Sequence, residues 1–464
     1  MIHKWFLWLA CLAGGGVEAL SLHQRDKPAI VKIPVQRAAN VATRLQKRIS
    51  TVSAPFEVQE EPEFPRFFSN VTIGTPPQEI QVRLDTSSGY LAITASNSNY
   101  CESTNEEGYF NISSSSTYQV LDHDFNATYY QGHILTGDFA NEKVGINGAI
   151  IPAMELGVNF GIDGDNVLGL GYLVGPESDA PARILQALIK TGDIKSAAYS
   201  LWMDDSIGTT GSILFGGVNT AKYVGELHTM SIPAINGVHH LPVALVTGIA
   251  VQAGGASKNT TSDLPFYVAL DSAVSWTYLP DGVVEQIYKD LGAWYYGDVG
   301  RLNCTVGQKG YNVTFTFSDF DLSIPVSDFI LGGDGEVCIF SIVPSGGQTA
   351  VLGATFLQSI YVVYDLSNNE ISIAPTNFSS GEDNILEIGS GSSAISGAAS
   401  VSVTTSAIVP TTVIEPNPIR FFPPTSVSSA QSATSTSKGG AIAPTGSPNK
   451  VMAGLIGAGL LIVL

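Results

Sequence analysis

The sequence predicts a mostly β protein made of two similar lobes. Short runs rich in Val, Ile, Tyr, Phe and Thr, broken by Gly, Asn, Asp and Pro, fill residues 66–377, whereas helical patterns are few and short. The phrase "VRLDTSSGYL" around Asp85 returns as "VALDSAVSWTYL" around Asp271, and each is followed at similar spacing by "NVLGLGY" or "AVLGATF". Matched phrases in the same order indicate an internal duplication.

Charge narrows the function classes. The chain of 464 residues has 41 acidic and 22 basic residues, a formal net charge of −19. This balance argues against nucleic acid and against electrostatic binding to anionic lipid. It agrees with simple solubility and also with work at low pH, where carboxylates are partly neutral.

The amino-terminal residues have the pattern of a secretory leader. Residues 1–19 combine a basic start, a short apolar core and small residues at a cleavage site, so we expect a signal peptide. The rival, a membrane anchor, would need roughly 20 apolar residues. Residues 20–48 end at the dibasic pair Lys47–Arg48 and are interpreted as a removable propeptide, with an ordinary charged loop as the alternative.

Secretion implies disulfide chemistry and glycosylation. Cys11 leaves with the signal peptide, and we expect Cys304 to pair with Cys338 in the second lobe. Cys101 is then free, capped or intermolecular. Asn-x-Ser/Thr sequons predict glycosylated surface positions: Asn70, Asn111, Asn126, Asn259, Asn303, Asn312 and Asn377.

The carboxyl-terminal composition predicts a stalk and a lipid anchor. Residues 378–439 are rich in Ser and Thr with little charge, which is typical of an extended, O-glycosylated stalk. Small residues from Gly439, a polar spacer and a wholly apolar end make residues 440–464 a GPI-anchor signal that is removed. The alternative is a tail-anchored helix, but residues 451–464 span only about 21 Å against a bilayer core of about 30 Å.

The repeated aspartates suggest a reaction. Two duplicated lobes can bring Asp85 and Asp271 face to face, where two close carboxylates share one proton over an acidic range. The ionised group then activates a water for attack on a peptide carbonyl, and the protonated group assists the carbonyl oxygen. The mechanism needs no covalent intermediate, metal or cofactor.

The same phrases resemble the pepsin-like aspartic proteases, most closely the GPI-anchored fungal yapsins. The likeness covers nearly all of residues 66–377, including "VTIGTPPQEIQVRLDTSSG", "ALDSAVSWTYLP" and "VLGATFLQSIYVVYDLSNNEISIAPTNF". It implies a bilobed double β-barrel with an active-site cleft between lobes 66–230 and 231–377, a zymogen, a hairpin flap and a catalytic pair at Asp85 and Asp271.

The resemblance also assigns supporting roles. Thr86 and Ser272 match the hydroxyl residues that brace the two active-site loops across the lobes. Tyr130 matches the flap tyrosine, because "YQGHILTG" has the family's interval to a turn glycine, here Gly137; Tyr129 is the alternative.

Several positions depart from the family pattern. Ser87 and Ala273 stand where each active-site loop has Gly, and both add a Cβ beside the carboxylates. Ser88 keeps the hydroxyl expected to reach the outer oxygen of Asp85, but Val274 lacks one, which should raise the pKa of Asp271. The remaining departures replace a family Asp, Trp and Asp: Tyr90, Ala92 and Ala354.

Two functions follow from this reading. The first is a monomeric acid endopeptidase of the cell surface or cell wall, acting on peptide or protein substrates and attached to the membrane through its lipid alone. The second is an inactive pepsin-fold protein that binds peptides or serves as a wall glycoprotein. The two aspartates favour the first, and Ser87 and Ala273 favour the second. No "GxSxG", "HExxH" or phosphate-loop pattern is present, and the histidines are scattered.

Overall fold

The computed structural model describes the chain in twelve segments. They are residues 22–23, 28–37, 66–104, 109–128, 134–174, 179–204, 210–260, 262–296, 299–318, 320–379, 381–389 and 399–400. The chain divides into two units, Met1–Arg420 and Phe421–Leu464, and every described residue belongs to the first. The signal peptide, the Lys47–Arg48 pair and Gly439 lie outside the described residues.

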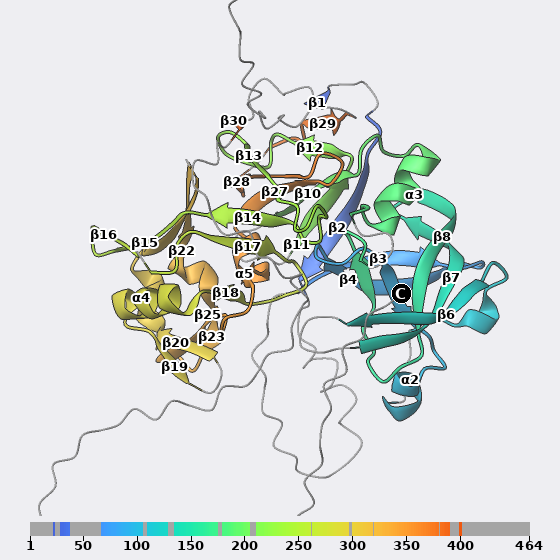
Figure 1. Ribbon diagram of the computed structural model, residues 1–464, viewed down its shortest axis with the longest axis horizontal. Coiled ribbons are helices and arrows are strands. Elements are labelled where there is room, and N and C mark those ends of the chain that lie inside the picture. The colour runs from blue at the N-terminus through green and yellow to red at the C-terminus, as the bar shows by residue number, and fades with distance from the viewer. Residues whose placement is uncertain are drawn as a thin grey trace, which may run out of the picture. The chain divides into compact units, whose positions relative to one another are not determined.

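The prediction of a mostly β, bilobed fold is confirmed. The largest sheet has 14 strands and runs from the first lobe into the strands between the lobes (Figure 1). In spatial order they are β30 (Ala399–Ser400), β13 (His228–Ser231), β28 (Glu370–Pro375), β27 (Ile360–Asp365), β10 (Ala198–Met203), β11 (Thr210–Phe215), β2 (Val31–Arg37), β3 (Phe67–Ile73), β4 (Gln78–Asp85), β9 (Val167–Gly169), β5 (Leu91–Thr94), β8 (Ala149–Asn159), β7 (Ile134–Ile146) and β6 (Gln119–Thr128).

The second lobe has three smaller sheets. One orders β14 (Val243–Val246), β17 (Phe266–Leu270), β26 (Ala350–Leu352), β18 (Thr277–Leu279) and β25 (Ile342–Pro344). Another orders β16 (Ala256–Asn259), β15 (Gly248–Ala253), β21 (Asn312–Phe317) and β22 (Phe320–Pro325). The third orders β19 (Trp294–Tyr296), β20 (Val299–Asn303), β24 (Val337–Phe340) and β23 (Ile330–Gly333). Cys304 follows β20 and is disulfide-bonded to Cys338 on β24, with Cα atoms 5.0 Å apart.

The duplication is visible in strand order. The first lobe runs β3–β4–β9–β5–β8 and the second runs β14–β17–β26–β18–β25. In both orders, the four successive pairs of neighbouring strands are antiparallel, parallel, antiparallel and parallel. The tips of β4 and β17 therefore occupy equivalent places in the two lobes.

Helices are short and few in the described residues. They are α2 (Asn99–Thr104), α3 (Arg183–Thr191), α4 (Asp281–Leu291) and α5 (Ala354–Leu357). α3 and α4 end at Gly192 and Gly292, which adopt the left-handed conformation with φ of 83° and 70°, the usual glycine stop for a helix. Free Cys101 lies in α2 and is buried, with its Sγ 3.4 Å from the carbonyl oxygen of Ala95.

Strand β2 comes from the segment expected to be a propeptide. It lies between β11 and β3 in the large sheet, with Ile33 and Val35 wholly buried in the main core. The alternation of apolar Val31, Ile33 and Val35 with Lys32 and Pro34 explains this placement, because alternate side chains of a strand face one side. Part of residues 20–48 is thus an integral strand of the folded chain.

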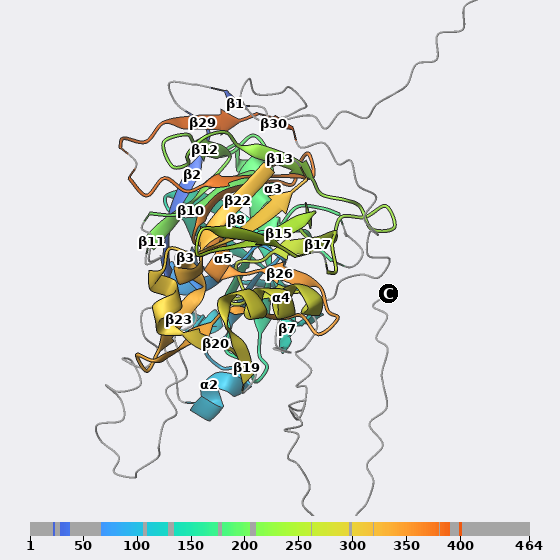
Figure 2. The same cartoon turned by 90° about the vertical axis from the view of Figure 1, so that its left-hand side faces the viewer.

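The folded unit also continues beyond residue 377. Strand β29 (Ile385–Ile388) lies between β1 (Leu22–His23) and β12 (Gly217–Asn219), and Ile388 is fully buried. Figures 1 and 2 both place β1, β29 and β12 together at the end of the unit opposite α2. The amino-terminal part of the segment expected to be a stalk is therefore folded.

Of the seven sequon asparagines, none is buried: Asn312 and Asn377 are half-buried and the other five are exposed. Across the described segments, no helix has both the length and the apolar character that crossing a bilayer requires.

We expect Ile33→Ala to lower the free energy of unfolding by about 2–5 kcal/mol, because it leaves a cavity in the core beneath the central sheet. Chemical denaturation of the full chain measures this. Lys32→Ala, at the neighbouring partly exposed position, is the control and should cost under about 1 kcal/mol. Equal effects of the two substitutions would contradict a structural role for β2.

Candidate active site

Asp85 ends a buried strand of the first lobe. β4 runs parallel to β9, with Leu84 opposite Leu168 and Asp85 opposite Gly169. A Cβ at Gly169 would lie 2.6 Å from the backbone nitrogen and oxygen of Tyr90. Glycine is therefore required where the chain after Asp85 packs back against β9, which explains the glycine in "NVLGLGY".

Asp271 has the same setting in the second lobe. It follows β17, which runs parallel to β26, and its backbone N–H donates to the carbonyl oxygen of Leu352 at 3.1 Å. A Cβ at Gly353 would lie 2.2 Å from the carbonyl oxygen of Trp276 and 2.5 Å from that of Val274. The repeated glycines thus allow the two active-site loops to fold in the same way.

Four hydrogen bonds join the two loops. The Thr86 hydroxyl donates to the carbonyl oxygen of Leu270 at 2.8 Å, and the Ser272 hydroxyl donates to that of Leu84 at 2.8 Å. The backbone N–H of each residue donates to the other's hydroxyl oxygen, at 3.2 Å from Thr86 and 3.1 Å from Ser272. Both side chains are fully buried. This reciprocal brace holds the tips that bear Asp85 and Asp271 together.

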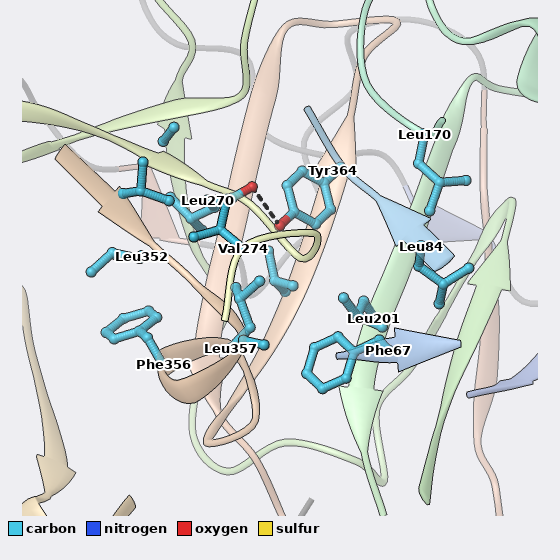
Figure 3. Close-up of a cluster of buried hydrophobic side chains, with 14 of the residues drawn as sticks. Phe67, Leu84, Leu170, Leu201, Leu270, Val274, Leu352, Phe356, Leu357 and Tyr364 are labelled. Carbon is cyan, nitrogen blue, oxygen red and sulfur yellow. Dashed lines mark hydrogen bonds between the residues drawn. The ribbon is translucent and has the colours of Figure 1, made fainter. Parts of the chain in front are cut away.

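Aromatic residues from the strands between the lobes lie beneath the brace. The Tyr364 hydroxyl donates to the carbonyl oxygen of Leu270 at 3.3 Å, as Figure 3 shows. Tyr364 also stacks on Tyr199, with ring centroids 4.9 Å apart. Both residues look like ordinary core aromatics in the sequence, so their position under the aspartates was not predicted.

Backbone amides hold each carboxylate. The N–H groups of Ser87 and Ser88 donate to Oδ1 of Asp85 at 2.8 and 3.2 Å, and the N–H of Ala273 donates to Oδ1 of Asp271 at 2.8 Å. Neither Ser87 nor Ala273 has a positive φ. The substitutions of glycine therefore introduce no left-handed backbone strain.

The hydroxyl that reaches Asp85 comes from an unexpected residue. Ser87 Oγ donates to Oδ1 of Asp85 at 2.7 Å, whereas Ser88 Oγ is buried without a hydrogen-bond partner among the described residues. The expectation that Ser88 supplies this hydroxyl is therefore wrong. In the other loop, Val274 is fully buried near Leu357 and Phe356 (Figure 3) and offers no donor.

Known proteins with similar sequences identify the family to which this site belongs. Residues 66–376 match the profile of the eukaryotic aspartyl proteases. The chain belongs to the eukaryotic aspartyl protease family. It is 40% identical to a probable aspartic-type endopeptidase, opsB, of Aspergillus oryzae, over 96% of each chain. It is also 32% identical to aspartic proteinase yapsin-3 of Saccharomyces cerevisiae, over 76% of this chain and 74% of the relative.

The two aspartates of this aspartyl protease family member are both buried, with 2% and 6% of Asp85 and Asp271 exposed. Burial, and then the charge of Asp85, raise the pKa of Asp271 to about 7. A raised pKa of Asp271 is what the missing hydroxyl at Val274 led us to expect. Burial, however, is the larger cause. A proton on Asp271 below about pH 7 gives the site an acid beside a potential base.

Arg83 connects the site to both lobes. It lies two residues before Asp85, so both side chains leave the same face of β4. Its guanidinium is 3.1 Å from Asp165 Oδ2 and 3.4 Å from the carbonyl oxygen of Ala273. The charge of Arg83 lowers the pKa of Asp271, opposing the effects of burial and of Asp85. An arginine inside the apolar run "IQVRLD" is the signal of this role in the sequence.

The hairpin expected to be the flap is formed by β6 and β7. Tyr130 and the alternative Tyr129 lie outside the described residues, between these strands. Gly137 is inside β7, paired with Phe125 and Asn159, so its assignment to a turn is wrong. Glycine is required there because a Cβ would lie 2.0 Å from the carbonyl oxygen of Val158.

Phenylalanines of this hairpin pack against Ala92, where the family pattern has tryptophan. Ala92 is fully buried against Phe125, whose ring meets Phe139 edge-on at 5.2 Å. Phe139 also lies 5.4 Å from the ring of Tyr90. Aromatic side chains of the hairpin itself therefore fill the space above Ala92. Within the described ranges, no three or more His, Cys, Asp or Glu side chains group as metal ligands.

We expect Asp271→Asn to remove a pH-dependent loss of stability. A carboxyl whose folded pKa is raised holds its proton in the folded state, so its contribution is favourable below pH 3.8 and falls between about pH 4 and 7. The wild type should lose up to roughly 4 kcal/mol over this range relative to the variant. Denaturation at pH 4, 5.5 and 7 measures the difference. Parallel curves would contradict the raised pKa of Asp271.

Proposed function

We propose that this protein is an aspartic endopeptidase that hydrolyses peptide bonds at acidic pH with Asp85 and Asp271. The reciprocal brace between Thr86 and Ser272 is the observation that carries the proposal, because it holds the loops of both aspartates together. Family membership and the names of the relatives support peptides or proteins as substrates.

The pKa of Asp271 supports a division of roles. Below about pH 7 this carboxyl keeps its proton and can donate it to the carbonyl oxygen or to the leaving amine. Asp85 then acts as the base that removes a proton from the attacking water. The buried setting of both groups strengthens these interactions, because the local dielectric is low.

A second candidate function is peptide binding without hydrolysis. The contact from Ser87 Oγ to Asp85 Oδ1 favours it, because that hydroxyl occupies a hydrogen-bonding site on the proposed base. The loops that carry the two aspartates would then hold peptides that are not cleaved.

We expect the full chain, produced in a eukaryotic secretory host, to cleave members of a mixed peptide library between pH 3 and 7. Asp85→Asn should lower the rate at least about a thousandfold, because the amide cannot accept the proton of the water. Mass spectrometry of the products measures cleavage. Retained cleavage in Asp85→Asn would contradict the mechanism, and binding without any cleavage would favour the second function.

We also propose that the protein is a secreted, monomeric glycoprotein with a GPI lipid. The leader, the sequons and the small-residue, spacer and apolar order at the carboxyl end support this. Processing after Lys47–Arg48 accounts for the dibasic pair. A cut there leaves β2 held between β11 and β3 by hydrogen bonds until the sheet opens.

Peptide mapping of the purified cell-surface protein should find one terminus at Ile49 and the other at Gly439 carrying the lipid, and native purification should retain residues 31–37. An intact chain from residue 20 would contradict processing at the dibasic pair. A carboxyl terminus at Leu464 would contradict the lipid anchor.

A further inference from the structure

We propose that the Ser87 hydroxyl occupies the place of the attacking water on Asp85 and thereby restrains hydrolysis. This inference rests on the proposed function of the two aspartates. It goes beyond it because it assigns to a single side chain, at a position where the family has glycine, control over how readily the site admits its nucleophile.

The Oδ1 atom of Asp85 has no hydrogen-bonding capacity left. It accepts from the N–H of Ser87 at 2.8 Å, the N–H of Ser88 at 3.2 Å and Ser87 Oγ at 2.7 Å. A carboxylate offers about four lone-pair sites over its two oxygens, or two on each. With three donors on Oδ1, a water cannot also donate to this oxygen while the Ser87 hydroxyl stays in place.

The same hydroxyl reaches the other aspartate. Its interaction with the Asp271 carboxyl lowers the pKa of Asp271, while its one proton is donated to Oδ1 of Asp85. One oxygen that interacts with both carboxyl groups has the position required of a water shared by an acid and a base. The hydroxyl oxygen of Ser87 thus stands in for a solvent molecule, but it is tied to the backbone.

The hydroxyl of the neighbouring serine, Ser88, does not hydrogen-bond Asp85. Ser88 Oγ is buried and has no partner among the described residues, although its own N–H contacts Asp85. Of the two loop serines, Ser87 is therefore the one whose hydroxyl binds Asp85, and it binds Oδ1, the oxygen that also accepts the loop amides. Hydrolysis then requires the Ser87 hydroxyl to rotate away, at the loss of a hydrogen bond to a charged group.

The test compares Ser87→Ala and Ser87→Gly with the wild-type full chain. Both variants remove the hydroxyl, and Ser87→Gly also removes the Cβ. We expect kcat/KM for library peptides to rise about tenfold or more in both. The basic limb of the pH profile should move to higher pH, because a contact that lowers the pKa of Asp271 is lost. Ser196→Ala, which removes a buried hydroxyl far along the chain from both loops, is the control and should change neither quantity.

A binding measurement separates this inference from the proposed function. The probe is a hexapeptide library in which a hydroxyethylene unit replaces the central amide, since its secondary alcohol competes with Ser87 for the same carboxylates. We expect tighter calorimetric binding to both Ser87 variants than to the wild type. Denaturation midpoints verify that each variant is folded. If Ser87→Ala does not fold, the comparison is made with Ser87→Gly alone.

The outcomes are distinct. Cleavage by the wild type with an unchanged or lower rate in the Ser87 variants overturns the inference and leaves the peptidase proposal intact. If no form cleaves peptides, the peptidase proposal fails. Tighter binding of the alcohol probe to the variants would then support occupation of the Asp85 site by the Ser87 hydroxyl but not restraint of hydrolysis, and equal binding would overturn both.

Discussion

The structure depends on hydrogen bonds that each lobe makes with the other's active-site loop. A hydroxyl from one lobe donates to a buried carbonyl of the other, and the relation is repeated in reverse. Buried carbonyl and N–H groups left without partners would be costly. Each lobe therefore supplies hydrogen-bond partners for buried groups of the other. The loop around each aspartate is held in place only when both lobes are folded together. The duplicated strand order places the four participating groups in register.

This constraint also explains why two carboxyl groups are tolerated in a buried place. Amides of the loops donate to each carboxylate, and the guanidinium of Arg83 supplies positive charge nearby. Burial still raises the pKa of Asp271 well above its usual range. The free energy of unfolding is therefore lower near neutral pH than it would be without this carboxyl. A stability cost of this kind at Asp271 is common at functional sites.

Much of the fold could be predicted because it depends on local sequence patterns. Strand alternation and the repeated phrases led to a bilobed β protein, and the matched Asp85 and Asp271 pointed to a shared site. The other features depend on contacts between distant segments. Which of Ser87 and Ser88 reaches the carboxylate is decided by loop geometry, and the placement of Gly137 inside β7 by the register of three strands.

Boundaries were harder to predict for the same reason. The dibasic pair Lys47–Arg48 separated residues 20–48 from the lobes, and the Ser- and Thr-rich composition separated residues 378–439. Short strands such as β1, β2 and β29 are stabilised by partners far along the chain, so their sequence shows only a few alternating apolar residues. The packing of Phe125 against Ala92, where the family has Trp, is likewise a tertiary contact that the sequence does not show.

The position of β29 between β1 and β12 has a consequence for how the two ends of the folded chain relate. Beyond the paired backbone, the N–H of Ala29 donates to the buried carboxylate of Glu387 at 2.7 Å. If the amino-terminal segment departs, β29 becomes an edge strand with unpaired polar groups along one side. Such an edge accepts an added strand from another chain. Retention of the amino-terminal segment therefore protects the start of the carboxyl-terminal tail from unwanted association.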